Sequence, residues 1–471
     1  MGNPADPVLC VDFGSTFTKA ALVDGQTGEL LGTASHRTTL DTDVLDGLDA
    51  CRAELARSHP LVGGAEVLAC SSAGGGLWIA VVGNEELVTA EAGRRVALSS
   101  GGKVVAVLSR VSDDVAYRDL AHTTRPDVVL LTGGTDEGDE DGILLGARRI
   151  AASGWHGPVV VAGNTAAQAE VTALLGGLLD GLPVVITDNV VPKIGVLEPE
   201  PARRAIREMF LAHVIGGKHL SRRADFTSMV RGATPDLVLT GVEVLSGVVH
   251  DDPSTGLGTS GVVVVDIGGA TTDVHSVVKL DPEDAGLSRE VVASTPVTRT
   301  VEGDLGMRWS ALSTWEAGRD AGLVGEDLHA AAVRRAAEPS LLPENDLERD
   351  EDELIAATAA TLALRRHVGR SRVVVGPDGR VVERTGQDLR EVALLVGSGG
   401  VLRHAAPERV DRLLAALTGV SPEGFQQPEH PRVVVDRDYV LAAVGLLTGR
   451  RPTAAAALAR SLSACDETRE S

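Results

Sequence analysis

The sequence predicts an α/β fold made of two similar lobes and an inserted parallel α/β unit. An apolar run, an aspartate and a glycine-rich turn occur at 8–19 and again at 262–273. Between them, residues 84–190 alternate between apolar runs and helix-like stretches, which is typical of a parallel sheet. We therefore expect a first lobe formed by residues 1–83 and 191–250, an insert at 84–190, a second lobe at 251–460 and a polar tail at 461–471.

The composition fits a globular chain of two to three domains, with 43% apolar and 23% charged residues among 471. A net charge of −22 argues against nucleic acid and anionic membranes as main partners. The four cysteines form no Cys-x-x-Cys, so neither a zinc site nor a disulfide framework is indicated. No signal peptide and no apolar stretch of spanning length is visible, so we expect a cytoplasmic protein.

The elements of the first lobe follow from the apolar pattern. Residues 8–35 predict a meander of strands, 43–58 a helix, and 67–70 a strand that enters a glycine turn. We expect 77–82 to return as a strand within this lobe. After the insert, the stretch 198–231 is amphipathic and predicts helix.

The insert is expected to open with a helix at 85–99 and to contain four strands, near 103–108, 127–132, 158–162 and 183–187. The strands end in polar loops at 132–136, 162–164 and 188–189. Ligands bind at such strand ends in open parallel sheets. Ordinary turn residues explain the same pattern equally well, so both interpretations stay open.

The second lobe begins after a polar loop at 250–260. The acidic run 344–353 predicts a solvated helix start, since acidic side chains favour that end of the helix dipole. An apolar strand at 392–396 runs into a glycine cluster, followed by a helix start. Two further segments, 236–245 and 439–446, predict helices whose small residues allow close crossing.

The two matching turns have the composition of phosphate-binding loops. An aspartate at a strand end can hold a hydrated divalent cation, and a glycine two residues later lets the backbone approach a phosphate. One such turn is weak evidence, but two matching turns favour nucleotide binding. The candidate phosphate ligands are Gly14, Ser15, Thr16, Thr18, Gly268, Gly269, Thr271 and Thr272. Lys19 could also reach a phosphate, although a surface lysine is the simpler interpretation.

The remaining candidates would bind the nucleoside or take part in catalysis. The cluster Gly397, Ser398, Gly399 and Gly400 suits the close approach of a base or ribose, although alone it would be a flexible loop as often. Asp12 and Asp266 are the expected holders of hydrated Mg²⁺ and the residues that orient water. Glu302 and Asp304 are the next candidates for a catalytic carboxylate, although we favour a plain turn between strand and helix there.

The order of phosphate loop, second phosphate loop and adenosine loop resembles the actin-like ATPase superfamily of sugar kinases, Hsp70 chaperones and actin. The helices at 236–245 and 439–446 resemble its two interlobe connecting helices. Within the superfamily, the words DFGSTFTKA, GGTDEGDEDGIL, TDNVVPKIGVLEPEPARRAIREMF, VVDIGGATTDVHS, EGDLGMRWS and VGSGG resemble the glutamate mutase L family over about residues 8–450. That family is unrelated to the mismatch-repair protein of the same short name.

The resemblance implies an accessory ATPase that uses ATP/ADP and Mg²⁺ and reactivates an adenosylcobalamin-dependent glutamate (methylaspartate) mutase. The usual Asp-x-His-x-x-Gly cobalamin word is missing, so the chain should act on a cobalamin enzyme rather than carry the cofactor. Three alternatives remain. They are a small-molecule kinase of the same fold, an activator of a radical dehydratase, which the scattered cysteines disfavour, and a non-catalytic nucleotide-gated scaffold, which the intact Asp12 and Asp266 disfavour.

Overall fold

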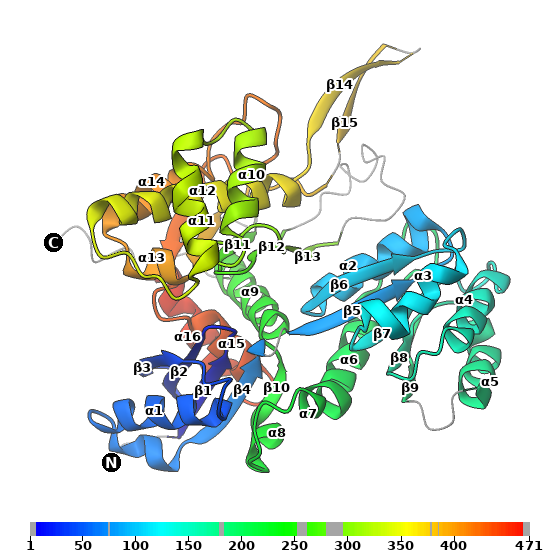
Figure 1. Cartoon of the computed structure of the whole chain (residues 1–471), viewed down its shortest axis with the longest axis horizontal. Helices are drawn as coiled ribbons and strands as arrows, with labels where there is room; N and C mark the ends of the chain where they lie inside the picture. The colour runs from blue at the N-terminus through cyan, green and yellow to red at the C-terminus, as the bar shows by residue number, and fades with distance from the viewer. Residues whose placement is uncertain are drawn as a thin grey trace. The chain divides into compact units, whose positions relative to one another are not determined.

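The computed structural model describes residues 6–73, 76–178, 183–251, 261–278, 295–376, 379–384 and 386–464 (Figure 1). The chain divides into two compact units. Unit 1 comprises Met1–Asp24, Leu30–Leu239 and Glu290–Thr295, and unit 2 comprises Gly25–Glu29, Thr240–Arg289 and Pro296–Ser471. Most of the loop predicted at 250–260 and most of the predicted polar tail lie outside the described residues.

The first sheet of unit 1 has the strand order β10-β4-β1-β2-β3. The predicted meander is confirmed as three antiparallel strands, β1 (Pro7–Phe13), β2 (Phe17–Asp24) and β3 (Leu30–Arg37). Two strands, β4 (Glu66–Ser71) and β10 (Val230–Ala233), continue the sheet parallel to β1. Strand β1 is central and buried along nearly its whole length, which explains its continuous apolar run.

The second sheet of unit 1 is the predicted parallel sheet. Its order is β6-β5-β7-β8-β9, and every pair in it is parallel. The strands are β5 (Leu77–Val82), β6 (Gly102–Leu108), β7 (Val128–Leu131), β8 (Val159–Val161) and β9 (Val184–Ile186). We expected 77–82 to belong to the first lobe, which is wrong, because β5 pairs with β6 and β7. The composition of a segment indicates that it forms a strand, but it does not indicate with which other strands it pairs.

Helices line this sheet and link it to the first one. They include α2 (Glu91–Ser99), α3 (Asp114–Asp119), α4 (Asp141–Ala152), α5 (Gln168–Leu178) and α6 (Glu200–Met209). The single helical stretch expected at 198–231 is broken. After α6 come a π-helical turn at Phe210–Val214, α7 (Ile215–Gly217) and α8 (Asp225–Met229), and from Val230 the chain is strand β10.

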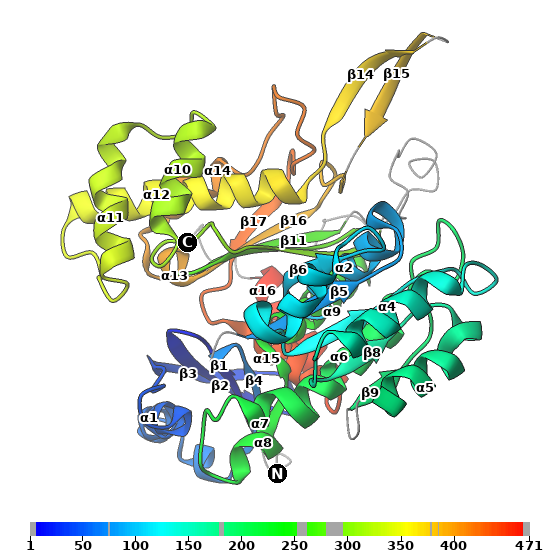
Figure 2. The same ribbon diagram turned by 45° about the vertical axis from the view of Figure 1, so that its right-hand side comes forward.

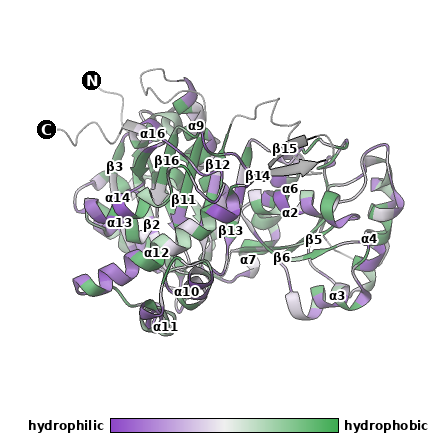
Figure 3. Cartoon of the chain, turned by 90° about the horizontal axis from the view of Figure 1, so that it is seen from above, coloured by the Kyte–Doolittle hydropathy of each residue, from purple (hydrophilic) through white to green (hydrophobic). Residues whose placement is uncertain are grey.

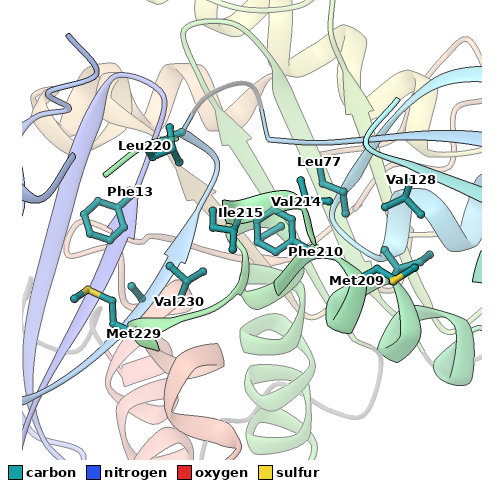
Figure 4. Packing of buried hydrophobic residues seen from close by; sticks show 14 of the residues in the cluster. Phe13, Leu77, Val128, Met209, Phe210, Val214, Ile215, Leu220, Met229 and Val230 are labelled. Carbon is teal, nitrogen blue, oxygen red and sulfur yellow. The ribbon is translucent and has the colours of Figure 1, made fainter. Parts of the chain in front are cut away.

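One apolar core runs through both sheets of unit 1. Figure 4 shows Phe210 and Met209 near Leu77 and Val128 of the parallel sheet, with Phe13 of β1 in the same cluster. All five side chains are 2% exposed or less. The insert is therefore packed into unit 1 rather than attached to it by a linker.

The sheet of unit 2 has the order β13-β12-β11-β16-β17. Strands β11 (Val262–Ile267), β12 (Thr272–Val277) and β13 (Val297–Glu302) are antiparallel neighbours, and β16 (Leu394–Ser398) and β17 (Arg432–Val435) continue the sheet parallel to β11. The valine run of β11 is buried, and its ribbon lies among the hydrophobic strands of Figure 3.

Helix α12 (Asp346–His367) packs along this sheet, as Figure 2 shows, beside α10 (Ala311–Asp320), α11 (His329–Ala337) and α14 (Pro407–Ala415). Its start confirms the helix predicted from the acidic run, with Asn345 accepting a hydrogen bond from the Glu348 N–H at 3.0 Å. The hairpin of β14 (Ser371–Gly376) and β15 (Gly379–Arg384) was not predicted.

The first sheet of unit 1 and the sheet of unit 2 have the same strand order and the same directions. Each consists of an antiparallel meander followed by two parallel strands, the duplicated ribonuclease H-like arrangement of the actin-like fold. Together with the inserted parallel sheet, this confirms the predicted fold class. No helix in the described part of the chain is long and apolar enough to cross a membrane.

The helices predicted at 236–245 and 439–446 are also confirmed, as α9 (Thr234–Asp251) and α15 (Val440–Thr448), the latter followed by α16 (Pro452–Ala464). Each begins close after the last strand of its sheet, β10 or β17. Figure 1 shows α9 beside α15. A Cβ added to Gly241 of α9 would collide with the carbonyl oxygen of Leu441, so this glycine is what lets the helices cross closely.

Candidate nucleotide-binding loops

The first loop joins β1 to β2 and is held by its own backbone. The N–H of Gly14 donates to the Phe17 carbonyl at 3.1 Å, which closes the turn. A Cβ on Gly14 would lie 2.7 Å from the same oxygen, so only glycine fits. Ser15 and Thr16, at the tip, are exposed. The turn therefore exposes its tip to solvent, while Asp12, next to it, stays in the strand.

The second loop, between β11 and β12, repeats this geometry. The N–H of Gly268 donates to the Thr271 carbonyl at 2.9 Å, and a Cβ on Gly268 would lie 2.7 Å from that oxygen. In the strands, Asp266 pairs with Asp273 as Asp12 pairs with Lys19. The resemblance of the two sequences is therefore a resemblance of backbone structure.

Both tips offer N–H groups that the rest of the chain does not use. Counting only partners within the described residues, the N–H groups of Ser15, Thr16, Gly269 and Ala270 make no hydrogen bond. The carbonyls of the second tip are occupied instead. Gly268 and Gly269 accept from the N–H groups of Met307 and Arg308 at 3.0 and 2.8 Å. Fixed carbonyls and free N–H groups are the arrangement that binds anions.

Asp12 is 8% exposed and sits in a neutralising environment. The Thr234 hydroxyl, at the start of α9, donates to its Oδ1 at 2.6 Å. The Lys19 ammonium lies 3.6 Å from Oδ2. Lys19 is thus an ion-pair partner of the loop aspartate rather than an isolated surface lysine. On the neighbouring strand, Cys70 is paired with Asp12.

Asp266 has a different environment. Ser398 of the third loop is paired with it across β11 and β16. Beyond Ser398, Asp436 follows β17 and is 2% exposed, and its carboxylate accepts from the N–H groups of Val440 and Leu441 at 2.8 and 3.2 Å. Burial raises the pKa of Asp436 to about 6, and the nearby charge of Asp266 acts in the same direction.

The third loop lies against the second. Strand β16 ends at Ser398, and α13 (Gly400–His404) begins directly after Gly399. Gly399 has φ 115°, and a Cβ there would collide with the Ile267 carbonyl, so this position requires glycine. Gly400 has open space around it. The predicted strand, glycine cluster and helix are confirmed, and they stand beside the second loop within unit 2.

Some predicted phosphate ligands lie where a phosphate would not reach their side chains. Thr18 and Thr272 are both 0% exposed, and they occupy corresponding positions in β2 and β12. The Thr18 hydroxyl lies 3.3 Å from that of Thr38, which in turn donates to the Gly14 carbonyl at 2.8 Å. Thr18 thus supports the first loop through Thr38, whereas the buried hydroxyl of Thr272 has no hydrogen-bond partner among the described residues. Thr271 is half-buried at the end of its turn.

Glu302 and Asp304 share one arginine. The Arg366 guanidinium donates to Glu302 at 2.7 Å and to both oxygens of Asp304 at 2.7 and 2.9 Å. These bonds lower the pKa of Asp304, whereas burial raises that of Glu302. Glu302 is the last residue of β13, paired with Thr272, and not part of a turn as we favoured. Asp304 does lie in the turn that follows.

The polar loops of the insert are tied to one another. Three buried asparagines hold the loop after β7. Asn84 donates to the Asp139 carboxylate at 2.8 Å, Asn164 to the Gly138 carbonyl at 3.3 Å, and Asn189 to the Gly134 carbonyl at 3.0 Å. These contacts give the predicted strand-end loops a structural role.

Sequence analysis missed Thr234 and Asp436. Each directly follows the last strand of its sheet: Thr234 is the first residue of α9, and Asp436 lies four residues before α15 begins. The helices were predicted from their small residues, and the polar side chains that precede or begin them were not considered. The duplication could have revealed them, because a residue after the last strand of each sheet lies beside the loop aspartate.

The chain was compared with known proteins. A family model described as MutL protein matches residues 8–462. Protein MutL of Clostridium tetanomorphum is 35% identical over 459 residues, covering 95% of this chain and 97% of that protein. Among solved structures, the ethanolamine utilization protein EutJ from Carboxydothermus hydrogenoformans has 12% identity and a TM-score of 0.29, with 95% of this chain and 90% of that one covered. Xylulose kinase from Bifidobacterium adolescentis has 12% identity and a TM-score of 0.31, with 98% and 94% covered. The family model and the MutL relative agree over almost the full length, and the chain belongs to the MutL protein family.

Proposed function

We propose that the protein binds ATP and hydrolyses it slowly with Mg²⁺, and that it serves as an accessory, reactivating factor for an adenosylcobalamin-dependent glutamate mutase. The observation that carries the ATPase proposal is the repetition of one closed turn, Gly14 with Phe17 and Gly268 with Thr271, each beside a strand-end aspartate. The mutase as partner is inferred from membership of the MutL family.

In this proposal the loop tips take the phosphates. The unused N–H groups of Ser15, Thr16, Gly269 and Ala270 would donate to phosphate oxygens, and the exposed hydroxyls of Ser15 and Thr16 would add to them. The third loop, from Gly397 to Gly400, would receive the adenosine. Phosphoryl transfer needs positioning and charge stabilisation more than covalent help, and fixed backbone donors supply both.

The carboxylates suit a hydrated magnesium ion. Within the described residues there is no group of three or more His, Cys, Asp or Glu side chains arranged to hold a metal on their own. Mg²⁺ is usually held by one or two carboxylates together with substrate phosphates and water. Asp12 and Asp266 are the proposed holders, and the ion, when bound, would neutralise phosphate charge. Glu302 remains a proposed catalytic carboxylate, held in place by Arg366.

Turnover tests the ATPase proposal. We expect phosphate release from Mg·ATP by the purified protein and its loss in Asp266→Ala, with ADP still bound. Asp438→Ala, which removes an exposed carboxylate of unit 2, is the matched control and should keep its turnover. Unchanged turnover in Asp266→Ala would remove this residue from the mechanism.

The accessory role needs its own experiment. Inactivated glutamate mutase is incubated with the protein, Mg·ATP and fresh adenosylcobalamin, and mutase activity is followed. Recovery that requires ATP, and that Asp266→Ala does not support, is expected. Phosphorylation of a small metabolite with no effect on the mutase would instead place the protein among the kinases of this fold.

A further inference from the structure

Asp436 stands beside the second loop and has no part in the function proposed so far. We propose that Asp436 is a positioning residue of the cation site, whose negative charge joins that of Asp266 in attracting the divalent cation that accompanies the nucleotide. It would do so while anchoring the first turn of α15. The inference rests on the proposed binding of Mg·nucleotide.

The sheet brings the two aspartates together. Asp266 is paired with Ser398 on β16, and Gly397 is paired with Val435 at the end of β17. The N–H of Asp436 donates to the Gly397 carbonyl at 2.9 Å, so the chain is still held against β16 at this residue. Strand β16 alone therefore lies between the two chain segments that carry these carboxylates, and both carboxylates lie at the same end of the strands.

Asp436 carries a negative charge, whereas Thr234, which holds the corresponding place beside Asp12, is uncharged. Asp12 has the Lys19 ammonium at 3.6 Å and the Thr234 hydroxyl at 2.6 Å. Asp436 forms no ion pair with a lysine or arginine of the described chain, and it is 2% exposed. A buried carboxylate beside a second carboxylate is costly unless a positive charge compensates both. A divalent cation at the second loop would supply that charge.

Asp436 is placed to act through its charge rather than as a direct ligand. Its Oδ1 and Oδ2 already accept from the N–H groups of Val440 and Leu441. Those bonds fix its orientation and attach α15 to the strand end. To ligate the cation directly, an oxygen of Asp436 would have to give up its hydrogen bond to α15. The electrostatic attraction between Asp436 and a cation at the second loop requires no such movement.

The test measures metal affinity directly. Mn²⁺ is titrated, in the presence of ADP, into the wild type, Asp436→Asn and Asp438→Asn, and the free ion is followed by electron paramagnetic resonance. Asn keeps the size of Asp436 and one acceptor for α15 but removes the charge. We expect about a tenfold or larger loss of Mn²⁺ affinity in Asp436→Asn. The control Asp438→Asn, which removes an exposed charge two residues away, should stay close to the wild type.

Metal-free ADP binding and thermal stability separate the possible roles. In Asp436→Asn, metal-free ADP should bind as well as before or more tightly, since a negative charge near the phosphates is gone. Asp436→Ser, which keeps a capping hydroxyl, repeats the test if the Asn variant fails to fold. Equal Mn²⁺ affinity in the two Asn variants, or lower stability of Asp436→Asn with unchanged Mn²⁺ affinity, would overturn the proposal. A wild type that binds no Mn²⁺ with ADP would overturn the proposed function as well.

Discussion

The Thr234 hydroxyl donates to the carboxylate of Asp12, a group that is 8% exposed. A buried carboxylate depends on such donors, because water cannot replace them. Asp436 has the corresponding place near Asp266 but brings a second negative charge. At the scale of residues, the two loops therefore share a backbone and differ in the side chain that follows the last strand.

Thr234→Val tests the first of these contacts. Valine keeps the shape of threonine and removes the hydroxyl, which leaves Asp12 short of one donor. We expect a loss of about 1–3 kcal/mol in the free energy of unfolding, measured by urea denaturation. Thr172→Val, on the exposed face of α5, is the control and should change it by less than about 0.5 kcal/mol. Equal effects of the two substitutions would contradict the role of Thr234.

His367 predicts a dependence of stability on pH. It is buried between the hydroxyls of Ser276 and Thr300, at 2.8 and 3.0 Å, and burial lowers its pKa to about 3. The folded state therefore keeps His367 neutral, while the unfolded chain takes up a proton below its usual pKa of 6.5. The contribution of His367 to the free energy of unfolding is fully present above pH 6.5. It is lost as the pH drops from 6.5 towards 3, by at most about 1.4 kcal/mol per pH unit.

His367→Gln should remove that part of the slope, since glutamine keeps polar contacts and does not titrate. The measurement is urea denaturation at pH 7 and pH 5.5. His430→Gln, at an exposed position, is the control and should retain the slope of the wild type. A slope that His367→Gln leaves unaltered would show that another group, such as the equally buried His275, carries the effect.

At the scale of elements, each loop depends on one glycine whose Cβ position is already occupied. Gly268→Ala would place a methyl group 2.7 Å from the Thr271 carbonyl, whereas Gly269→Ala meets the side chain of Arg308 at 3.5 Å, an ordinary contact. We expect Gly268→Ala to open the turn and to weaken ATP binding by about tenfold or more, at a cost of about 1–3 kcal/mol in stability. Calorimetric titration with ATP measures the affinity.

Gly269→Ala is the control from the same turn. It should change ATP affinity far less, because its backbone needs no rearrangement. A similar loss of ATP affinity in both variants would mean that any side chain in this turn weakens binding. The hydrogen bond that closes the turn at Gly268 would then not explain the effect.

The third loop offers a second matched pair. Gly399 has φ 115° and no room for a Cβ, whereas Gly400 starts α13 with open space around it. Gly399→Ala should lower the melting temperature, since it combines backbone strain with a collision against Ile267. Gly400→Ala should leave it unchanged or raise it, because alanine favours the helix. The opposite ranking in a thermal melt would contradict the described geometry.

Sequence patterns identified these elements well but not their neighbours. Apolar runs predicted β1, β11 and β16, and glycine after aspartate predicted both turns. The pairing of β5 with β6 and β7, and the return of the chain to the first sheet as β10, depend on contacts between residues far apart in the chain. For the same reason the partners Thr234 and Asp436 could not be read from the segments that contain the loops.

At the scale of the whole molecule, the chain repeats one sheet topology and inserts a third sheet into unit 1. The repeated topology places both loop aspartates at the end of a central strand. A chain with net charge −22 can still bind an anion at such a point, because local N–H groups and a cation outweigh the distant field. The central proposal is that each of these two loops is needed for the binding of ATP.

Calorimetric titration of Mg·ATP into the wild type, Gly14→Ala and Gly268→Ala tests this claim most directly. The proposal predicts that Gly14→Ala and Gly268→Ala each weaken the binding of Mg·ATP. An affinity for Mg·ATP that either substitution leaves unchanged would contradict it.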